Sequence, residues 1–127
     1  MNLKKILILD DDRDLLEGIK GVLEDAGYSY IATDDSGTVQ QKIRSYHPNI
    51  IILDVFLNEF RGENIAKKLK TSIDTKLIPI ILISGSDRIK KLHQESKAET
   101  YLRKPFSGNE LLEKIDSLTK NNYSFIV

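Results

Sequence analysis

Three continuous runs of apolar residues constrain the fold of this chain more than any other feature of its sequence. The runs cover residues 6–9, 50–53 and 78–83. Each run is followed directly by a polar residue, respectively Asp10, Asp54 and Ser84. An apolar run of this length without alternation is typical of a strand covered on both faces, as in a parallel sheet. The sequence therefore predicts buried parallel strands with polar carboxyl ends.

Amphipathic segments separate these strands. Apolar residues at helical spacing predict helices over residues 15–26, 36–43, 65–73, 87–97 and 107–118. Two weaker strands are expected at residues 28–33 and 100–103, and residues 55–62 read as a loop. Strands and helices alternate five times without a repeat or a linker. This pattern predicts an α/β fold, a doubly wound five-stranded parallel sheet with helices on both faces.

Composition excludes several classes of function. The 127 residues fit one domain, and 19 basic and 19 acidic residues cancel, which argues against nucleic-acid binding by bulk charge. The chain has no cysteine and only two histidines, so thiol catalysis and a histidine-rich metal centre are not expected. The apolar start of the chain stops at Asp10, too early for an export signal, and no run is long enough to span a bilayer. We therefore predict a cytoplasmic protein.

The chemistry is expected at the carboxyl ends of the strands, where open parallel sheets bind their ligands. The first strand leads into Asp10, Asp11 and Asp12, and the last leads into Lys104. Together with Asp54, these groups would form a cluster of carboxylates beside one ammonium group. Two carboxylates about 4 Å apart repel by about 4 kcal/mol at an effective dielectric constant of 20, so the cluster needs a cation. Oxygen ligands alone favour Mg²⁺, with Mn²⁺ as a possible substitute.

Each residue taken alone also has an ordinary structural explanation. Acidic residues at a helix start are often caps, and this explanation is preferred for Asp12 and Asp14. For Asp10 and Asp11 the sequence favours neither explanation, and a single Asp54 or Ser84 at a strand end is a weak signal. The functional interpretation depends on their joint pattern, in which each group ends its own buried strand.

At these residues the chain resembles the receiver domain of response regulators, the phosphoacceptor part of two-component signalling. The resemblance covers residues 4–118 and implies the flavodoxin-like fold. It is carried by the acidic pair after ILIL, by IIILD, by PIILIS, by YLRKPF and by the 30 residues that separate Asp54 from Ser84. We expect residues 1–119 to form this domain and residues 120–127 to form a short tail.

The resemblance assigns roles to individual positions. It implies that Asp54 accepts a phosphoryl group from a kinase phosphohistidine. It implies that Asp10 and Asp11 hold Mg²⁺ together with Asp54, and that the backbone carbonyl of Phe56 is a further ligand. Such a protein is a phosphoacceptor that catalyses its own phosphorylation and slow dephosphorylation, and not a conventional enzyme.

The resemblance also implies a conformational switch. Ser84 and Lys104 would contact the phosphoryl oxygens, and Tyr101 would turn inward when Ser84 moves toward the phosphate. A cis peptide bond is expected before Pro105. Because an apolar Phe56 cannot position water by hydrogen bonding, we predict a long-lived phosphorylated form.

Some positions depart from the family pattern. The loop after Asp54 has Asn58 and Arg61 where the family usually has a proline and an acidic residue, while Gly62 is kept. Only 20 residues separate Ser84 from Lys104, about two fewer than expected, and Lys97 replaces a usual glycine. We expect these changes to affect the choice of partner more than the chemistry.

Other functions stay open at this point. A phosphohydrolase of the haloacid-dehalogenase type would use Asp10 as its nucleophile, and a receiver without phosphorylation would act as an interaction module. The expected partners are a histidine kinase or phosphotransfer protein, and a downstream protein target or an output domain outside this sequence. The apolar residues near the end, Tyr123, Phe125, Ile126 and Val127, are expected to pack on the domain, to form a homodimer contact or to begin a further segment.

Overall fold

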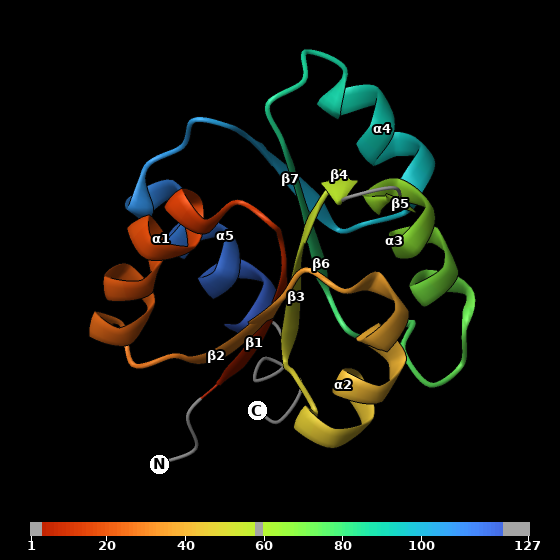
Figure 1. Ribbon diagram of the computed structural model, residues 1–127, viewed down its shortest axis with the longest axis horizontal. Helices are drawn as coiled ribbons and strands as arrows, with labels where there is room; N and C mark the ends of the chain where they lie inside the picture. Colours follow the sequence, from red (N-terminus) through yellow and green to blue (C-terminus); the bar gives the residue numbers. More distant parts are fainter. Residues whose placement is uncertain (1–3, 58–59, 121–127) are drawn as a thin grey trace.

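The structure is a computed structural model that describes residues 4–57 and 60–120. The residues of the apolar end, 121–127, lie outside this part, so the predictions for them are untested. Five parallel strands form one sheet in the order β2-β1-β3-β6-β7 (Figure 1). These are β1 (Lys5–Leu9), β2 (Ser29–Thr33), β3 (Ile50–Asp54), β6 (Ile80–Ser84) and β7 (Thr100–Arg103). The predicted α/β fold is confirmed, with the strand order of flavodoxin-like proteins.

Helices cover both faces of the sheet. Helices α1 (Arg13–Asp25) and α5 (Gly108–Lys120) lie on one face, and α2 (Val39–Tyr46), α3 (Gly62–Thr71) and α4 (Ile89–Ser96) lie on the other (Figure 1). A short 3₁₀ helix, η1 (Ser36–Thr38), precedes α2. Side chains along a strand alternate between the two layers, so Ile6 and Ile8 pack toward α1 and α5 while Leu7 and Leu9 pack toward α2 and α3. This two-sided burial explains why the strand sequences show no polar alternation.

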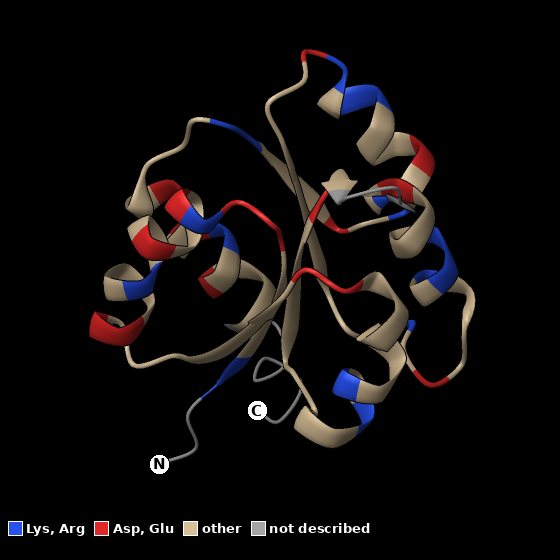
Figure 2. Cartoon of the chain, viewed as in Figure 1, with Lys and Arg blue, Asp and Glu red and all other residues tan. Residues whose placement is uncertain are grey.

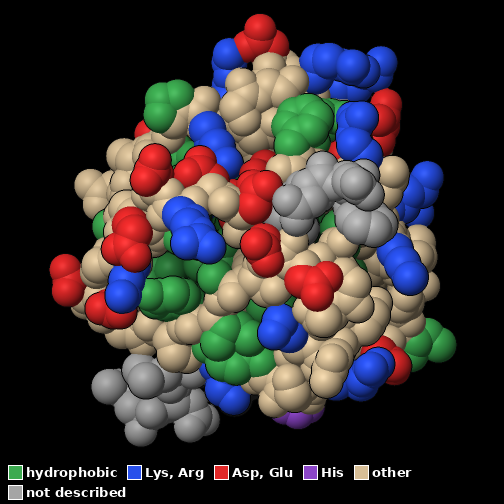
Figure 3. Space-filling view, in the orientation of Figure 1, with side chains coloured by type: hydrophobic (Ala, Val, Ile, Leu, Met, Phe, Trp, Pro, Cys, Tyr) green, Lys and Arg blue, Asp and Glu red, His purple; other side chains and the backbone are tan. Residues whose placement is uncertain are grey.

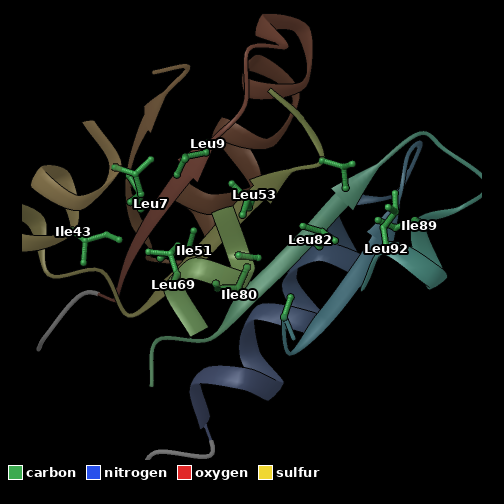
Figure 4. Packing of buried hydrophobic residues seen from close by; sticks show 14 residues of the cluster. Leu7, Leu9, Ile43, Ile51, Leu53, Leu69, Ile80, Leu82, Ile89 and Leu92 are labelled. Atoms are coloured by element: carbon green, nitrogen blue, oxygen red, sulfur yellow. The ribbon is translucent and has the colours of Figure 1, made fainter. Parts of the chain in front are cut away.

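The layer of α2, α3 and α4 is shown in Figure 4. Leu7, Ile51 and Leu53 from the sheet meet Ile43 of α2 and Leu69 of α3 there, and every one of these side chains is at most 5% exposed. Burial of an aliphatic side chain stabilises a fold by about 1.5–3 kcal/mol, so this layer fixes the strands firmly.

Two local predictions differ from the structure. The third apolar run enters the sheet only at Ile80, after Pro79, because proline has no N–H to donate within the sheet. Helix α3 ends at Thr71, since Ser72 has an extended backbone (φ −94°, ψ 135°). Ile73, the last residue of the helix predicted over residues 65–73, is therefore outside it and 84% exposed.

The segment after Asp54 is more regular than the predicted loop. Strands β4 (Phe56–Leu57) and β5 (Phe60–Arg61) pair antiparallel, with Phe56 opposite Arg61. The hairpin closes back onto β3, because the Gly62 N–H donates to the carbonyl of Val55 at 2.6 Å. A Cβ on Gly62 would lie 2.0 Å from the carbonyl oxygen of Asp54, so only glycine permits this approach.

Candidate phosphoacceptor site

The carboxyl ends of the parallel strands bring the predicted polar residues to one edge of the sheet. Asp10 directly follows β1, Asp54 is the last residue of β3, and Lys104 follows β7. Figure 2 shows acidic segments after β1 and at the end of β3 on the same edge, and acidic side chains gather on this face of the space-filling view (Figure 3). The sheet topology alone accounts for this convergence.

Three carboxylates form the centre of the cluster. One oxygen from each of Asp10, Asp11 and Asp54 lies within 4.8 Å of the other two. Asp10 is 1% exposed and Asp54 is 5% exposed, whereas Asp11 is exposed. At such distances the carboxylates repel one another, and the repulsion grows as water is excluded. The group can hold a metal ion, because hard divalent cations prefer several carboxylate oxygens.

One buried oxygen inside the cluster accepts no hydrogen bond from the described residues and has the Lys104 ammonium as a neighbour at 3.4 Å, which fits this interpretation. Asp10 Oδ1 accepts a hydrogen bond of 2.8 Å from the Asp12 N–H. Its other oxygen, Oδ2, is buried and accepts no hydrogen bond from any residue that the structure describes. A buried carboxylate oxygen without a hydrogen-bond partner is costly, and a cation at this position would satisfy it.

Lys104 supplies the positive charge within the cluster. Its ammonium nitrogen lies 3.3 Å from Asp54 Oδ2, 3.4 Å from Asp10 Oδ2 and 3.8 Å from Asp12 Oδ2. One ammonium group therefore faces three carboxylates, and it cannot neutralise all of them. The Lys104 N–H also donates to the carbonyl of Ser84 at 2.8 Å, which fixes the backbone beside β6.

The electrostatics of the cluster shift two pKa values. Burial, helped by the nearby charge of Asp54, raises the pKa of Asp10 from 3.8 to about 6, against the lowering effect of the Asp12 N–H and of Lys104. Burial lowers the pKa of Lys104, but Asp10 and Asp54 together raise it by more, so its pKa lies above the ordinary value. Lys104 is therefore charged at neutral pH.

Asp12 is a helix cap, as the preferred structural explanation predicts. Its side chain caps α1 by accepting from the Leu15 N–H at 3.1 Å. Its Oδ2 also faces Lys104 at 3.8 Å. The cap thus places a further carboxylate beside the cluster, at its more exposed side.

The predicted switch residues Ser84 and Tyr101 lie on the adjacent strands β6 and β7. Ser84 is fully buried, and its hydroxyl accepts from the Ser86 N–H at 3.0 Å. Tyr101 lies opposite Leu82 in the sheet, and its ring centroid is 5.0 Å from that of His93 in α4. The peptide bond before Pro105 is cis, as expected. The roles of Ser84 and Tyr101 as a switch stay predictions.

The sequence interpretation missed one feature of the hairpin after Asp54. The Phe56 N–H donates to Asp54 Oδ1 at 3.2 Å, and its half-exposed ring lies 5.4 Å from the guanidinium carbon of Arg61. Arg61 Nε is 2.7 Å from Oε1 of Glu63, a carboxylate that is only 8% exposed. The replacement of an acidic residue by Arg61 was noted, but its buried partner two residues later was not.

Comparison with known proteins identifies the family. Residues 6–116 match the response regulator receiver domain family. The chain belongs to this family. A receiver domain of this kind is a phosphoacceptor of two-component signalling and not a conventional enzyme, and the acidic cluster beside Lys104 is consistent with its phosphoacceptor site.

Individual relatives agree with the family. The receiver domain is 29% identical over 123 residues to the response regulator protein GraR of Staphylococcus aureus, an alignment that covers 95% of this chain and 54% of GraR. The chain thus spans about half the length of the curated relatives it matches.

Solved structures show the same fold. A CheY-like receiver domain protein from Methanospirillum hungatei is 27% identical, with a TM-score of 0.85 and coverage of 97% of this chain and 98% of that chain. The receiver domain of a signal transduction histidine kinase from Syntrophus aciditrophicus is 26% identical, with a TM-score of 0.84 and coverage of 93% and 91%, respectively. Across residues 4–57 and 60–120, none of the helices has the length and hydropathy needed to span a bilayer.

Proposed function

We propose that Asp54 is the phosphoacceptor of this receiver domain, and that its donor is the phosphohistidine of a histidine kinase or phosphotransfer protein. The observation that carries the proposal is the position of its carboxylate. Asp54 ends the central strand β3, almost fully buried, with the Lys104 ammonium 3.3 Å from one of its oxygens and the Asp10 and Asp11 carboxylates beside it.

In the proposed reaction an oxygen of Asp54 attacks phosphorus in line. The bond between phosphorus and the donor imidazole nitrogen breaks, and its electron pair stays on that nitrogen. Lys104 moves its contact from the carboxylate to the phosphoryl oxygens. Its positive charge there stabilises the negative charge that develops in the transition state. A carboxylate oxygen is a suitable nucleophile for this displacement, and Lys104 lies 3.3 Å from Asp54 Oδ2.

Asp10, Asp11 and Asp54 would hold Mg²⁺, or Mn²⁺ in its place, with the backbone carbonyl of Phe56 as a further ligand. When bound, the ion neutralises the carboxylates and stabilises charge on the phosphoryl oxygens. The buried Asp10 Oδ2 without a hydrogen-bond partner in the described chain supports this ligand set.

We further propose that the phosphoryl group changes the arrangement of Ser84 and Tyr101. The Ser84 hydroxyl would leave the Ser86 N–H for a phosphoryl oxygen, and the Tyr101 ring would leave His93 for the space behind Ser84. A shift from a mostly inactive to a mostly active population requires several kcal/mol of differential contact, which charge-assisted hydrogen bonds can supply. The altered surface would select a downstream protein or an output domain.

Residues 1–119 as the domain and a cytoplasmic location also stay predictions.

Intact mass after incubation with a small-molecule phosphodonor and Mg²⁺ tests the proposal. We expect the wild type to gain one phosphoryl group, Asp54→Ala to gain none, and the control Asp74→Ala to behave as the wild type. Asp74 is an exposed acidic residue before β6, at the opposite end of that strand.

Two other outcomes would overturn the proposal. A phosphorylated form that survives Asp54→Ala and is lost in Asp10→Ala would favour the haloacid-dehalogenase type of chemistry. No mass gain under conditions in which Mg²⁺ binds would favour an interaction module without phosphorylation.

A further inference from the structure

The hairpin after Asp54 places an aromatic ring beside a cation, and the first turn of α3 adds a buried carboxylate next to that cation. We propose that Arg61, held by Glu63, is a positioning residue that keeps Phe56 in place beyond Asp54 and thereby sets the lifetime of the phosphorylated form. The inference rests on the proposed function of Asp54. Arg61 acts through Phe56, since among the described contacts it touches none of the cluster carboxylates.

Phe56 is connected to the acceptor through its backbone. The Phe56 N–H donates to Asp54 Oδ1 at 3.2 Å, so the backbone of residue 56 moves with the acceptor carboxylate. Phe56 is 51% exposed, so its side chain has little packing of its own to hold it. A neighbouring group must fix the ring if it is to have one position beside Asp54.

Arg61 is that group. It lies directly opposite Phe56 in the β4–β5 pair, and its guanidinium carbon is 5.4 Å from the ring centroid. A guanidinium within about 6 Å of an aromatic centroid attracts the ring.

Glu63 fixes the guanidinium in turn. Its Oε1 lies 2.7 Å from Arg61 Nε, and its side chain is 10% exposed, against 50% for Arg61. Its Oε2 is buried without a hydrogen-bond partner in the described part of the chain. Such a carboxylate is unfavourable without a cation, so it holds the Arg61 side chain in one orientation at the start of α3.

The consequence concerns loss of the phosphoryl group. In that reaction a water oxygen attacks phosphorus, the bond from phosphorus to the Asp54 oxygen breaks, and Asp54 regains its carboxylate as phosphate and a proton leave. An apolar ring beyond Asp54 cannot bind or orient this water. Release of the ring admits water, so removal of Arg61 speeds hydrolysis.

The lifetime of the phosphorylated form measures the effect. We expect Arg61→Met to shorten it by about two- to five-fold, the range that corresponds to one exposed cation–π contact. Phe56→Ala is expected to shorten it by at least as much. In the double variant the effect of Arg61→Met is expected to vanish, because the ring through which it acts is absent. Arg61→Lys keeps a cation over the ring and is expected to restore most of the lifetime.

Controls separate positioning from a merely structural role. Lys67→Met removes an exposed cation from α3, the helix that contains Glu63, and is expected to leave the lifetime unchanged. Glu63→Gln keeps an acceptor for Arg61 and is expected to have an intermediate effect, so the inference can be tested even if Arg61→Met folds poorly. A purely structural pair would lower the melting temperature and leave the lifetime unchanged.

Two results would overturn the inference. An unchanged lifetime in Arg61→Met, or an equal effect of Arg61→Met with and without the Phe56 ring, contradicts it while the proposed function stands. If the wild type gains no phosphoryl group, the proposed function fails, and the inference fails with it.

Discussion

The middle of β3 and its carboxyl end are both hidden from water, but they make opposite contributions to stability. Ile50, Ile51, Ile52 and Leu53 of β3 are fully buried, and so is the next residue, Asp54, to within 5%. Burial of the apolar side chains stabilises the fold, whereas burial of the carboxylate costs free energy. The comparison indicates that stability and function are carried by different residues of the same strand. Functional sites commonly cost stability in this way.

The largest expected effect lies in the middle of the sheet. Ile52→Ala removes a fully buried side chain from the layer of α1 and α5 and leaves a cavity. We expect the free energy of unfolding to fall by about 4 kcal/mol, measured by urea denaturation. Because the substitution touches no charged group, the phosphorylation of the folded variant is expected to be unchanged.

Ile52→Val supplies a second measurement if the alanine variant does not fold. It removes one methylene group, and the expected loss is about 1 kcal/mol. A loss of phosphorylation in folded Ile52→Val would contradict the separation of stability from function along this strand.

The next largest loss of stability is expected at Gly62, where the start of α3 approaches the carboxyl end of β3. In Gly62→Ala the new Cβ would lie 2.0 Å from the Asp54 carbonyl oxygen and 2.8 Å from the Val55 Cα, so the backbone must move. We expect a loss of about 3 kcal/mol in unfolding free energy, together with slower phosphorylation, since the hairpin is displaced from Asp54.

Gly18→Ala is the matched control for this substitution. Gly18 lies inside α1, and a Cβ there would meet nothing within 4 Å. Alanine is therefore expected to stabilise the protein by about 0.5–1 kcal/mol, because it favours the helix. Equal changes in unfolding free energy for Gly62→Ala and Gly18→Ala would show that the close approach of Gly62 to Asp54 does not require glycine.

The same comparison explains how much could be predicted from the sequence. The sheet and the convergence of Asp10, Asp54 and Lys104 were predictable, because parallel strands bring their carboxyl ends to one edge whatever the details of packing. The assignment of Ile73 to a helix face was wrong, because its spacing from Ile65 and Leu69 is helical but the backbone at Ser72 is extended. Periodicity does not report where a helix ends.

The hairpin could not be predicted by the same reasoning. Strands of two residues show no periodic pattern, so residues 55–62 were interpreted as a loop. Arg61 and Glu63 are two apart, a spacing at which side chains on a helix do not face each other. They pair because Arg61 precedes α3 with an extended backbone (φ −94°, ψ 121°), a conformation that the sequence does not specify.

A smaller effect, of opposite sign, is expected at the carboxyl end of β1. The rise of the Asp10 pKa from 3.8 to about 6 means that the folded protein binds more protons than the unfolded chain within this range of pH. The wild type without Mg²⁺ therefore loses stability through this group as the pH rises from about 4 to 6. Asp10→Asn is expected to be more stable than the wild type by at most about 3 kcal/mol at pH 7.5, and the gain should vanish near pH 4.

Addition of Mg²⁺ provides the control for this prediction. The ion is expected to raise the melting temperature of the wild type at pH 7.5 and to have little effect on Asp10→Asn, which lacks one of the proposed ligands. A gain in stability that is the same at pH 4 and pH 7.5 would mean that the charge of Asp10 is not its cause.

The smallest effect is expected at the opposite edge of the sheet, in the turn between α3 and β6. Ile73 and Leu77 are 84% and 86% exposed, so they contribute almost nothing to the core despite their apolar side chains. Ile73→Ser and Leu77→Ser are each expected to change the free energy of unfolding by less than about 0.5 kcal/mol in urea. An isoleucine side chain thus contributes several kcal/mol to the free energy of unfolding at position 52 and almost nothing at position 73. The contribution follows the apolar area removed from water and not the residue type. A loss above about 1 kcal/mol at either position would show that these side chains are covered in solution and that this turn is buried like the middle of β3.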